Sequence, residues 1–421
     1  MNFRSGSSSA QKRVLHFSDT LLARTETFVQ SRLFHERFEA VAATWRHIPD
    51  GLAIPCPFIV LDRHEPRGRN DGLARLLKGP VRVAARSWSM LRLLLGAKPD
   101  VVHAHFGTIG AGVAPFCQAL GIPLVVSFYG FDLAIDPADL TLQAAYAKMF
   151  RHGAVFTAEG PVLARRLVEI GAPAKRVRLL PLSLPAWAME PPPPRAPRPA
   201  GRLRLFQVAR FVEKKGVDLS LAAVAGARAR GVDIELTLAG GGPLEEELRA
   251  LTAELRIEDL VRFIGYVRHD DLSTLLAGCD ALIQPSRTAS NGDTEGGHPT
   301  IIVEALAQGV PIVATRHADI PFVVRNGETG LLTSENDLES LTDNLVRLAS
   351  EPQLLESLAR RGRSTVVRRH SPAVLLRLRE RLYREAIRQT TTSPMLPGWR
   401  SLPIPDPFGR GRTSRERTGV A

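Results

Sequence analysis

Hydrophobic positions along the chain follow two alternating patterns. Short apolar runs have the length and composition of β-strands, and the segments between them, such as 217–230 and 243–255, carry apolar residues at helical spacing. The strand-like runs are RVLHFS, FIVLD, VVHAHF, PLVVSF, AVFTAE and VRLLPL, followed later by LRLFQV, IELTLA, VRFIGY, ALIQPS and PIVAT. Two successive series of alternating strands and helices predict two doubly wound, mostly parallel α/β domains.

A proline-rich stretch, PPPPRAPRPAG at 191–201, separates the two series. Consecutive prolines lack backbone donors and hold an extended conformation, so the stretch suits a linker. It divides the 421 residues into an N-terminal domain at 1–190 and a C-terminal domain at 202–370. Because ligands gather at the carboxyl ends of parallel strands, we expect the site in the cleft where the domains face each other.

The C-terminal part of the chain has a different composition. The segment 337–388 is charged and helix-rich, and after Gln389 the chain is rich in Pro, Gly, Ser and Thr and net basic. We expect a helix at 371–389 and a largely disordered tail at 390–421.

Overall composition is that of a soluble globular protein, with 44% apolar and 23% charged residues. The three cysteines are scattered and form no CxxC pair, which suits a reducing cytosol and argues against a disulfide framework. The polar N-terminus lacks the apolar core of a signal peptide, and the most apolar stretch, 101–131, is broken by histidines, glycines and prolines. We therefore expect a cytoplasmic protein.

The net charge is +12, and residues 1–190 hold 23 Lys and Arg against 15 Asp and Glu. A basic domain can attract nucleic acid, an anionic bilayer or phosphorylated substrates, although an arginine-rich composition explains the surplus equally well. Nucleic acid is disfavoured because the cations are dispersed and Tyr and Trp total only eight.

Three segments of the C-terminal domain carry candidate chemistry. In FQVARFVEKKG, Arg210 ends a strand, and Lys214 and Lys215 precede a helix, a place where cations suit a phosphate group. In LTLAGGGPLEEEL, a strand enters three glycines, including Gly242, that would let a ligand approach backbone amides. Each segment alone also fits a solvated loop or a tight turn, and neither a dinucleotide fingerprint nor a P-loop is present.

The third segment, NGDTEGGHPTIIVEALAQG, holds two glutamates around a glycine–proline corner. Backbone amides at 296–300 would form an anion nest at a helix start. Glu304 lies in an apolar run, where an ionised carboxylate is costly unless something pairs with it. Its two oxygens could accept both hydroxyls of a vicinal diol such as ribose; pairing with a core arginine or with backbone amides is the alternative. Together the three segments describe a pocket for diphosphate and sugar hydroxyls, which indicates a nucleotide sugar.

The order VARFVEKKG, LAGGGPLEEEL, FIGYV, PSRTASNGDTEGGHPTIIVEALAQGVPIVAT and VRNGETGLL resembles the retaining glycosyltransferases of the GT-B fold, family 4, and GDTEGG-P-TIIVEA is most similar to the colanic-acid and exopolysaccharide branch. TETFVQSRL, VVHAHFG and SFYGFDL extend the resemblance more loosely into the first half. It implies two Rossmann-like domains, a nucleotide-sugar donor on the second, an acceptor on the first, and the 371–389 helix packed back on the first. It also implies no metal ion and no cofactor, because protein cations neutralise the leaving diphosphate.

By resemblance, Arg210 and Lys215 bind the donor diphosphate, Glu304 binds ribose and Glu295 lies near the transferred sugar. Tyr129 completes the expected catalytic set, together with Glu295, Arg210 and Lys215. Further expected donor contacts are Gly242, Gly297, His298 and Thr300, with Gly265, Tyr266 and Val267 beside the base. Expected residues on the acceptor side of the cleft are His105, Gly107 and Asp132. For His105 and the neighbouring His103, a structural histidine is an equal alternative.

Two positions depart from the family pattern. Eight residues separate Glu295 from Glu304, whereas seven is usual, and a bulge in the glycine loop could absorb the extra one. SFYGFD carries Tyr129 where many relatives have a histidine. A tyrosine hydroxyl can donate a similar hydrogen bond but cannot act as an imidazole base near neutral pH. A retaining reaction tolerates this if the leaving phosphate deprotonates the acceptor.

The expected partners are a nucleotide sugar, with UDP as the expected nucleotide by resemblance, and a lipid-linked saccharide acceptor presented at the inner membrane face. The basic first domain would then attract anionic lipid. Two alternatives stay open: a soluble transferase for a small acceptor, and a non-catalytic protein that binds nucleotide sugars.

Overall fold

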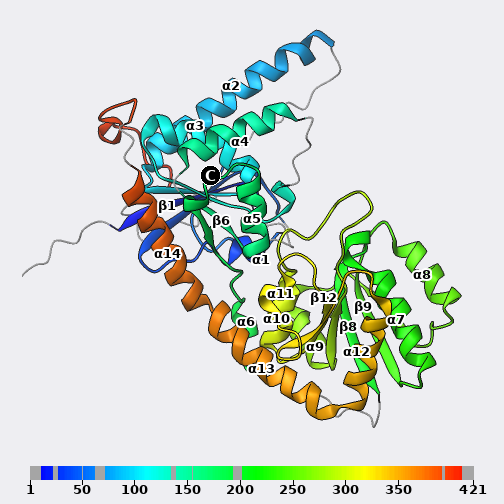
Figure 1. The fold of residues 1–421 in the computed structure, drawn as a ribbon. Helices are drawn as coiled ribbons and strands as arrows, with labels where there is room; N and C mark the ends of the chain where they lie inside the picture. Colours follow the sequence, from blue (N-terminus) through cyan, green and yellow to red (C-terminus); the bar gives the residue numbers. More distant parts are fainter. Residues whose placement is uncertain are drawn as a thin grey trace, which may run out of the picture.

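The computed structural model describes residues 11–21, 27–49, 51–61, 72–133, 139–153, 155–192, 202–390 and 394–409. Two lobes, each a parallel sheet covered by helices, lie side by side (Figure 1). This arrangement confirms the predicted pair of α/β domains. The proline-rich linker lies almost entirely outside the described residues, from 193 to 201.

The first domain contains a seven-stranded sheet in the order β3-β2-β1-β4-β5-β6-β7, with every neighbouring pair parallel. Its strands are β1 (Lys12–Leu21), β2 (Phe38–His47), β3 (Phe58–Val60), β4 (Val101–His105), β5 (Leu124–Ser127), β6 (Val155–Ala158) and β7 (Val177–Leu179). Its helices are α1 (Thr27–Gln30), α2 (Gly72–Ala97), α3 (Gly107–Leu120), α4 (Leu140–His152) and α5 (Pro161–Glu169). The strand order reverses between β1 and β4, which is where a doubly wound sheet opens a crevice.

The second domain contains a six-stranded parallel sheet in the order β10-β9-β8-β11-β12-β13. Its strands are β8 (Leu203–Arg210), β9 (Ile234–Gly241), β10 (Val261–Gly265), β11 (Ala281–Gln284), β12 (Ile312–Thr315) and β13 (Gly330–Thr333). The covering helices are α7 (Val217–Ala229), α8 (Glu245–Glu254), α9 (Leu272–Ala277), α10 (Thr300–Ala307), α11 (Ile320–Val323), α12 (Leu338–Ser350) and α13 (Pro352–His370). Its switch point lies between β8 and β11, so the loops after these strands face the crevice.

Two consecutive C-terminal helices join the lobes. The helix α13 runs along the second domain, and α14 (Pro372–Gln389) continues along the first (Figure 1). Leu375, Leu382 and Tyr383 of α14 share a buried apolar cluster with Val14 and Phe38 of the first sheet. The helix expected at 371–389 therefore lies against the first domain.

Part of the tail differs from the expected disorder. Residues 394–409 lie on the first domain, where the Trp399 side chain is only 4% exposed and its Nε1 donates to the Leu120 carbonyl at 2.8 Å. Asp406 forms an ion pair of 2.8 Å with the buried Arg13. These few contacts hold the segment on the first domain in spite of its polar composition. Residues 391–393 and 410–421 lie outside the described residues.

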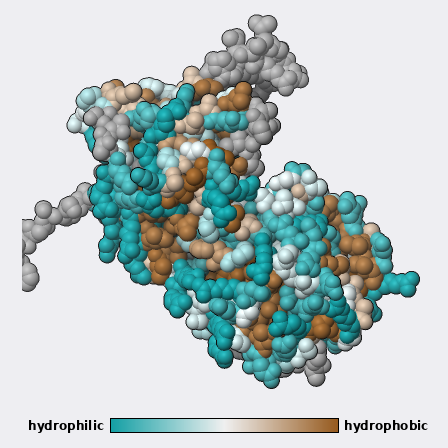
Figure 2. Space-filling view, in the orientation of Figure 1, coloured by the Kyte–Doolittle hydropathy of each residue, from teal (hydrophilic) through white to brown (hydrophobic). Residues whose placement is uncertain are grey.

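Hydrophilic side chains cover much of the visible face of both lobes, with apolar patches between them (Figure 2). Within the described part of the chain, no helix combines the length and the apolar character needed to cross a bilayer.

Candidate active site

A cavity of about 880 Å³ lies between the two domains, where the carboxyl ends of both sheets meet. Its first-domain wall includes Phe28, Tyr129 and Glu159. The second-domain wall is larger and comprises Lys215, Tyr266, Val267, His269, Glu295, Gly296, Gly297, His298, Pro299, Thr300, Ile301 and Glu304, among others. The site predicted between the domains is therefore formed by side chains of both.

The glycine–proline corner brings the two glutamates to one wall. Pro299 stands at the N-cap position of α10, and its fixed φ suits a helix start. The loop before it turns toward the first domain. Glu295 lies in that loop and Glu304 lies one turn into the helix. Both side chains are buried, at 7% and 2% exposure, and both line the cavity.

Glu295 is held by Lys215. The Lys215 Nζ lies 2.6 and 2.9 Å from the two carboxylate oxygens, and the Ser286 hydroxyl donates to Oε1 at 3.0 Å. Burial is the largest single effect and opposes ionisation of Glu295. The charges of Lys215 and Lys214 and the hydrogen bonds from Lys215 and Ser286 together outweigh it and lower the pKa of Glu295 below its ordinary value. The expected phosphate-binding lysine is thus paired with the expected sugar-binding glutamate.

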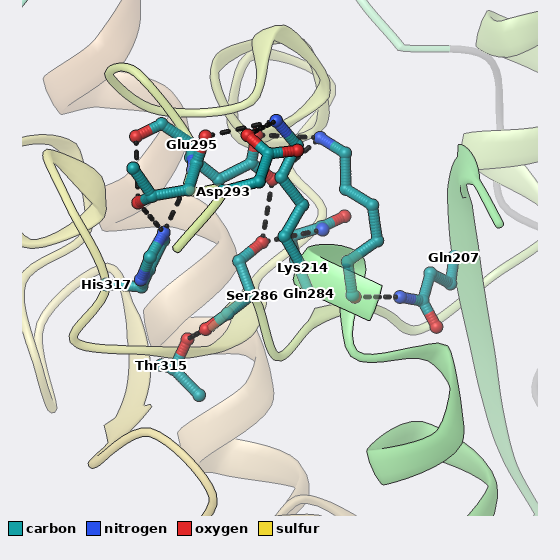
Figure 3. A network of polar contacts seen from close by, with 10 residues as sticks. Gln207, Lys214, Gln284, Ser286, Asp293, Glu295, Thr315 and His317 are labelled. Carbon is teal, nitrogen blue, oxygen red and sulfur yellow. Dashed lines mark hydrogen bonds and ion pairs between the residues drawn. The ribbon is translucent and has the colours of Figure 1, made fainter. Parts of the chain in front are cut away.

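A polar network supports this pair from behind (Figure 3). The His317 Nε2 accepts from the Glu295 amide at 3.1 Å, while its Nδ1 lies 2.7 Å from Glu335. Lys214 binds Asp293 at 2.9 Å and the Thr294 carbonyl at 3.0 Å. The neighbouring lysines therefore have different roles: Lys215 faces the cavity and Lys214 fastens the loop.

Glu304 is paired with a histidine. From the sequence, the alternatives to a ligand as its partner were a core arginine and backbone amides. The His269 Nε2 lies 3.0 Å from the Glu304 Oε1. Burial lowers the pKa of His269, but the hydrogen bond and charge of Glu304 outweigh it and raise the pKa above its ordinary value. Because Glu304 still lines the cavity, pairing with His269 does not remove it from a ligand's reach.

Tyr129 is the expected catalytic residue on the first-domain wall. Its hydroxyl lies 2.8 Å from His105 Nδ1, and the His105 Nε2 lies 3.0 Å from His16. His16 in turn contacts His35 at 2.9 Å. Burial strongly lowers the pKa of His16 and His105, so these rings are neutral and form a hydrogen-bonded relay behind Tyr129.

His105 and His103 were expected to face the cleft, and the structure places both behind its wall. Both side chains are fully buried, and His103 is satisfied by the Tyr383 hydroxyl and by Ser127 at 2.7 Å each. Ring nitrogens of His16, His103 and His105 lie within 4.8 Å of one another, a spacing that could hold a metal ion. The hydrogen bonds between these rings and the charge of the nearby Arg32 favour the structural interpretation.

Asp132 and Gly107 also lie behind the wall and do not line the cavity. The Asp132 carboxylate accepts from the amides of Gly107 at 2.7 Å, Tyr129 at 3.0 Å and Gly130 at 2.9 Å. It therefore fixes the loop that carries Tyr129. A Cβ on Gly107 would lie 2.2 Å from the Phe128 ring, which explains why glycine is needed there.

Among the expected donor contacts, Gly297, His298, Thr300, Tyr266 and Val267 line the cavity. Both ring nitrogens of His298 are buried and have no hydrogen-bond partner among the described residues, and burial, followed by His370, lowers its pKa to about 3.

Arg210, Gly242 and Gly265 are not among the residues that line the cavity. Arg210 ends β8 with an exposed side chain. Gly242 instead lies against Phe211 in a tight turn, with a φ of 158°. The turn interpretation of the glycine segment fits the structure better than direct ligand contact.

Two contacts hold the domains together beside the cavity. Gly130 has a φ of 110°, and a Cβ there would lie 1.8 Å from the Gly296 Cα across the interface. Asp319 of the second domain accepts from the Val162 amide at 2.8 Å and the Leu163 amide at 3.1 Å, at the start of α5. The contact between the domains therefore relies on a glycine on each side and on the Asp319 carboxylate, which caps helix α5 of the first domain.

Sequence reasoning missed several residues of the cavity, among them Glu159 and His269. Each comes soon after the end of a strand: Glu159 directly follows β6, and His269 lies four residues after β10. That position was a usable signal, because polar residues at carboxyl ends of strands face the crevice.

Comparison with known proteins connects this geometry to one family. The profile of the glycosyl transferases group 1 family matches residues 193–365, and that of the glycosyl transferase 4-like domain matches residues 53–183. A protein of Escherichia coli (strain K12) named as a colanic acid biosynthesis glycosyltransferase, WcaL, is 31% identical over 276 residues, or 64% of this chain and 66% of its own. The amylovoran biosynthesis glycosyltransferase AmsK of Erwinia amylovora is 28% identical over 59% of this chain and 61% of its own. The chain thus spans slightly less than two thirds of the length of these curated relatives.

A solved structure shares the fold over almost its whole length. The Anabaena protein HepE, solved in complex with UDP, superposes with a TM-score of 0.67 and covers 88% of this chain and 98% of its own, at 16% identity.

Proposed function

Since this chain belongs to the group 1 glycosyltransferases of the GT-B fold, we propose that it transfers a sugar, with retention of anomeric configuration, from a nucleotide-diphosphate sugar to a saccharide acceptor. The observation that carries this proposal is the placement of one cation and two carboxylates, Lys215, Glu295 and Glu304, on one wall of the interdomain cavity. A diphosphate needs a cation such as Lys215, and sugar hydroxyls suit carboxylate acceptors such as Glu295 and Glu304.

In the proposed complex, Glu304 accepts the two ribose hydroxyls and Lys215 binds the diphosphate. Lys215 must then exchange its partner, because the donor phosphate and Glu295 compete for the same ammonium group. Glu295, released toward the cavity, accepts hydroxyl hydrogen bonds from the transferred sugar.

Transfer breaks the bond between the anomeric carbon and the diphosphate oxygen and forms a new glycosidic bond on the same face. The acceptor hydroxyl gives its proton to the leaving diphosphate, so no side chain must act as a base, and Tyr129 can replace a histidine. Lys215 stabilises the growing negative charge of the diphosphate. The nucleotide sugar is a substrate, and we propose that the reaction needs neither a cofactor nor a metal ion.

We further propose UDP as the donor nucleotide and a lipid-linked saccharide of exopolysaccharide biosynthesis as the acceptor. The names of WcaL and AmsK, which refer to colanic acid and amylovoran, and the UDP in HepE support this choice. The basic surplus of the first domain suits an acceptor at the inner face of the plasma membrane.

Calorimetric titration with a UDP-sugar tests the donor site. We expect wild type to bind and Glu304→Ala to lose most of the affinity, because the ribose hydroxyls lose their acceptor. Glu254→Ala, at an exposed position of α8, serves as the control and should bind as wild type does. Equal affinity in wild type and Glu304→Ala would remove the reason for the ribose assignment.

Co-sedimentation with vesicles tests the acceptor side. Binding to anionic phosphatidylglycerol vesicles should exceed binding to neutral phosphatidylcholine vesicles and weaken with salt. Equal binding to both would instead favour a small, soluble acceptor.

A further inference from the structure

Glu159 is a buried carboxyl group on the first-domain wall that the proposed reaction leaves without a role. It follows β6 directly, precedes α5, lines the cavity and is 5% exposed. Within the described part of the chain, no hydrogen bond to its carboxyl group is found. Its carboxyl group therefore has hydrogen-bonding capacity left for a ligand in the cavity.

Burial, more than the charges around it, keeps Glu159 protonated. Burial is the largest cause; the Arg32 charge acts against it, and Asp319 and Asp132 act with it, raising the pKa of Glu159 to about 8. Tyr129 is the other titratable group on this side, and it is neutral because burial raises its pKa. At pH 7 the Glu159 carboxyl is therefore mainly a neutral donor.

Glu159 also contacts the loop assigned to the donor. A Cβ built on Gly297 would lie 2.7 Å from the Glu159 Oε2, so only glycine lets the loop come this close. Gly297 stands between Glu295 and the start of α10, where the sugar and the diphosphate of the donor would meet. The carboxyl group thus reaches across the domain interface to the reacting end of the donor.

We propose that Glu159 binds the donor as a neutral carboxylic acid and donates a hydrogen bond from the first domain to its diphosphate. This inference rests on the proposed donor site and adds a residue that the second domain does not supply. An ionised Glu159 would repel the diphosphate, whereas the neutral acid can support it as its negative charge grows during transfer. The proton stays on Glu159 throughout.

Donor binding should therefore be linked to proton uptake. The anionic diphosphate stabilises the protonated form, so molecules in which Glu159 is ionised must take up a proton when they bind UDP. At pH 8 about half of them are ionised, which predicts an uptake of about half a proton per UDP. The UDP affinity of wild type should also fall about tenfold between pH 7 and pH 9.

Calorimetric titration with UDP at pH 8, in two buffers of different ionisation enthalpy, measures this uptake directly. Glu159→Gln keeps a neutral donor of the same shape, so it should bind UDP without the uptake and with little change between pH 7 and pH 9. Glu169→Gln, the same change at the exposed end of α5, is the matched control and should behave as wild type does. Thermal melting of each variant verifies that it is folded.

Equal proton uptake by wild type and Glu159→Gln, with UDP bound by both, would overturn the role of Glu159 and leave the proposed function intact. Absence of UDP binding by wild type would overturn the proposed nucleotide and this inference with it. Uptake that is present in wild type and Glu169→Gln and absent from Glu159→Gln supports the proposal.

Discussion

The two walls of the cavity differ in the charge of their polar groups. On the second domain, each carboxyl group meets a basic group: Lys215 lies against Glu295, and His269 against Glu304. On the first domain, burial keeps the polar groups neutral, and Tyr129 is supported by a relay of uncharged histidines. When an anionic ligand binds, the paired groups of the second-domain wall must exchange partners, whereas the first-domain wall offers uncharged hydrogen-bonding groups.

This difference assigns separate tasks to the two walls. Lys215 holds its positive charge in a buried site at a tolerable desolvation cost, because the negative charge of Glu295 balances it until the donor diphosphate binds. A neutral wall can approach a diphosphate without repelling it. Substitutions on the charged wall should therefore have the larger effects on the reaction.

The largest effect is expected for Lys215→Ala. It removes the cation that faces the cavity and leaves Glu295 without the main cause of its lowered pKa, so that pKa should rise. We expect kcat to fall by about 10²–10³-fold, the usual cost of removing one charge-stabilising donor. Lys214→Ala, whose side chain binds Asp293, should lose far less in the same steady-state assay; equal losses would contradict the division of roles.

Gly130→Ala tests the contact between the walls. The new Cβ would clash with the Gly296 Cα at 1.8 Å and would need an unfavourable φ of 110°, so the domains should stand further apart. A displacement of about 1 Å at the reacting centre can cost about 10²-fold in rate. Small-angle scattering should show a larger radius of gyration, whereas Gly112→Ala, which meets no atom within 4 Å, should change neither quantity.

Tyr129→Phe tests the neutral wall. The change removes one hydroxyl and leaves the His105 Nδ1 without that partner. We expect unfolding to become easier by about 1 kcal/mol and kcat to fall by about tenfold or less. Chemical denaturation and rate measurements on the same preparation would separate the two effects. A loss as large as that of Lys215→Ala would show that the Tyr129 hydroxyl itself takes part in charge stabilisation.

The smallest effect is expected for the stability that His269 contributes through its pairing with Glu304. Its raised pKa means that His269 contributes stability that is fully present below its unfolded pKa, about 6.5, and is lost as pH rises through the folded pKa. The melting temperature of wild type should therefore exceed that of His269→Gln most at pH 6 and least at pH 9. A constant difference over this range would mean that the pair is not ionic.

The sequence predicted the charged wall better than the neutral one, for a physical reason. Lys215 and Glu295 belong to strand–helix connections, and Glu304 lies in the helix that follows the second of them, where composition and spacing indicate both the turn and the chemistry. Arg210 ends the strand just before such a connection, yet its side chain is exposed and is not among those that line the cavity.

The neutral wall depends on contacts between distant segments. His16, His35 and His105 come together only when β1 and β4 pair and the segment after α1 packs on them. Burial then decides their charge, and burial is a property of the whole fold. The same holds for the tail, where the anchoring of Trp399 needs a site on α3 that composition does not reveal.

A crystal structure with a UDP-sugar bound would test the central claim most directly, through the distances from Lys215 and Glu304 to the ligand. We predict that the Lys215 Nζ leaves Glu295 and lies about 3 Å from a phosphate oxygen, with the Glu304 oxygens at a similar distance from the ribose hydroxyls. A nucleotide bound while Lys215 stays on Glu295 and Glu304 stays clear of the ribose would contradict it.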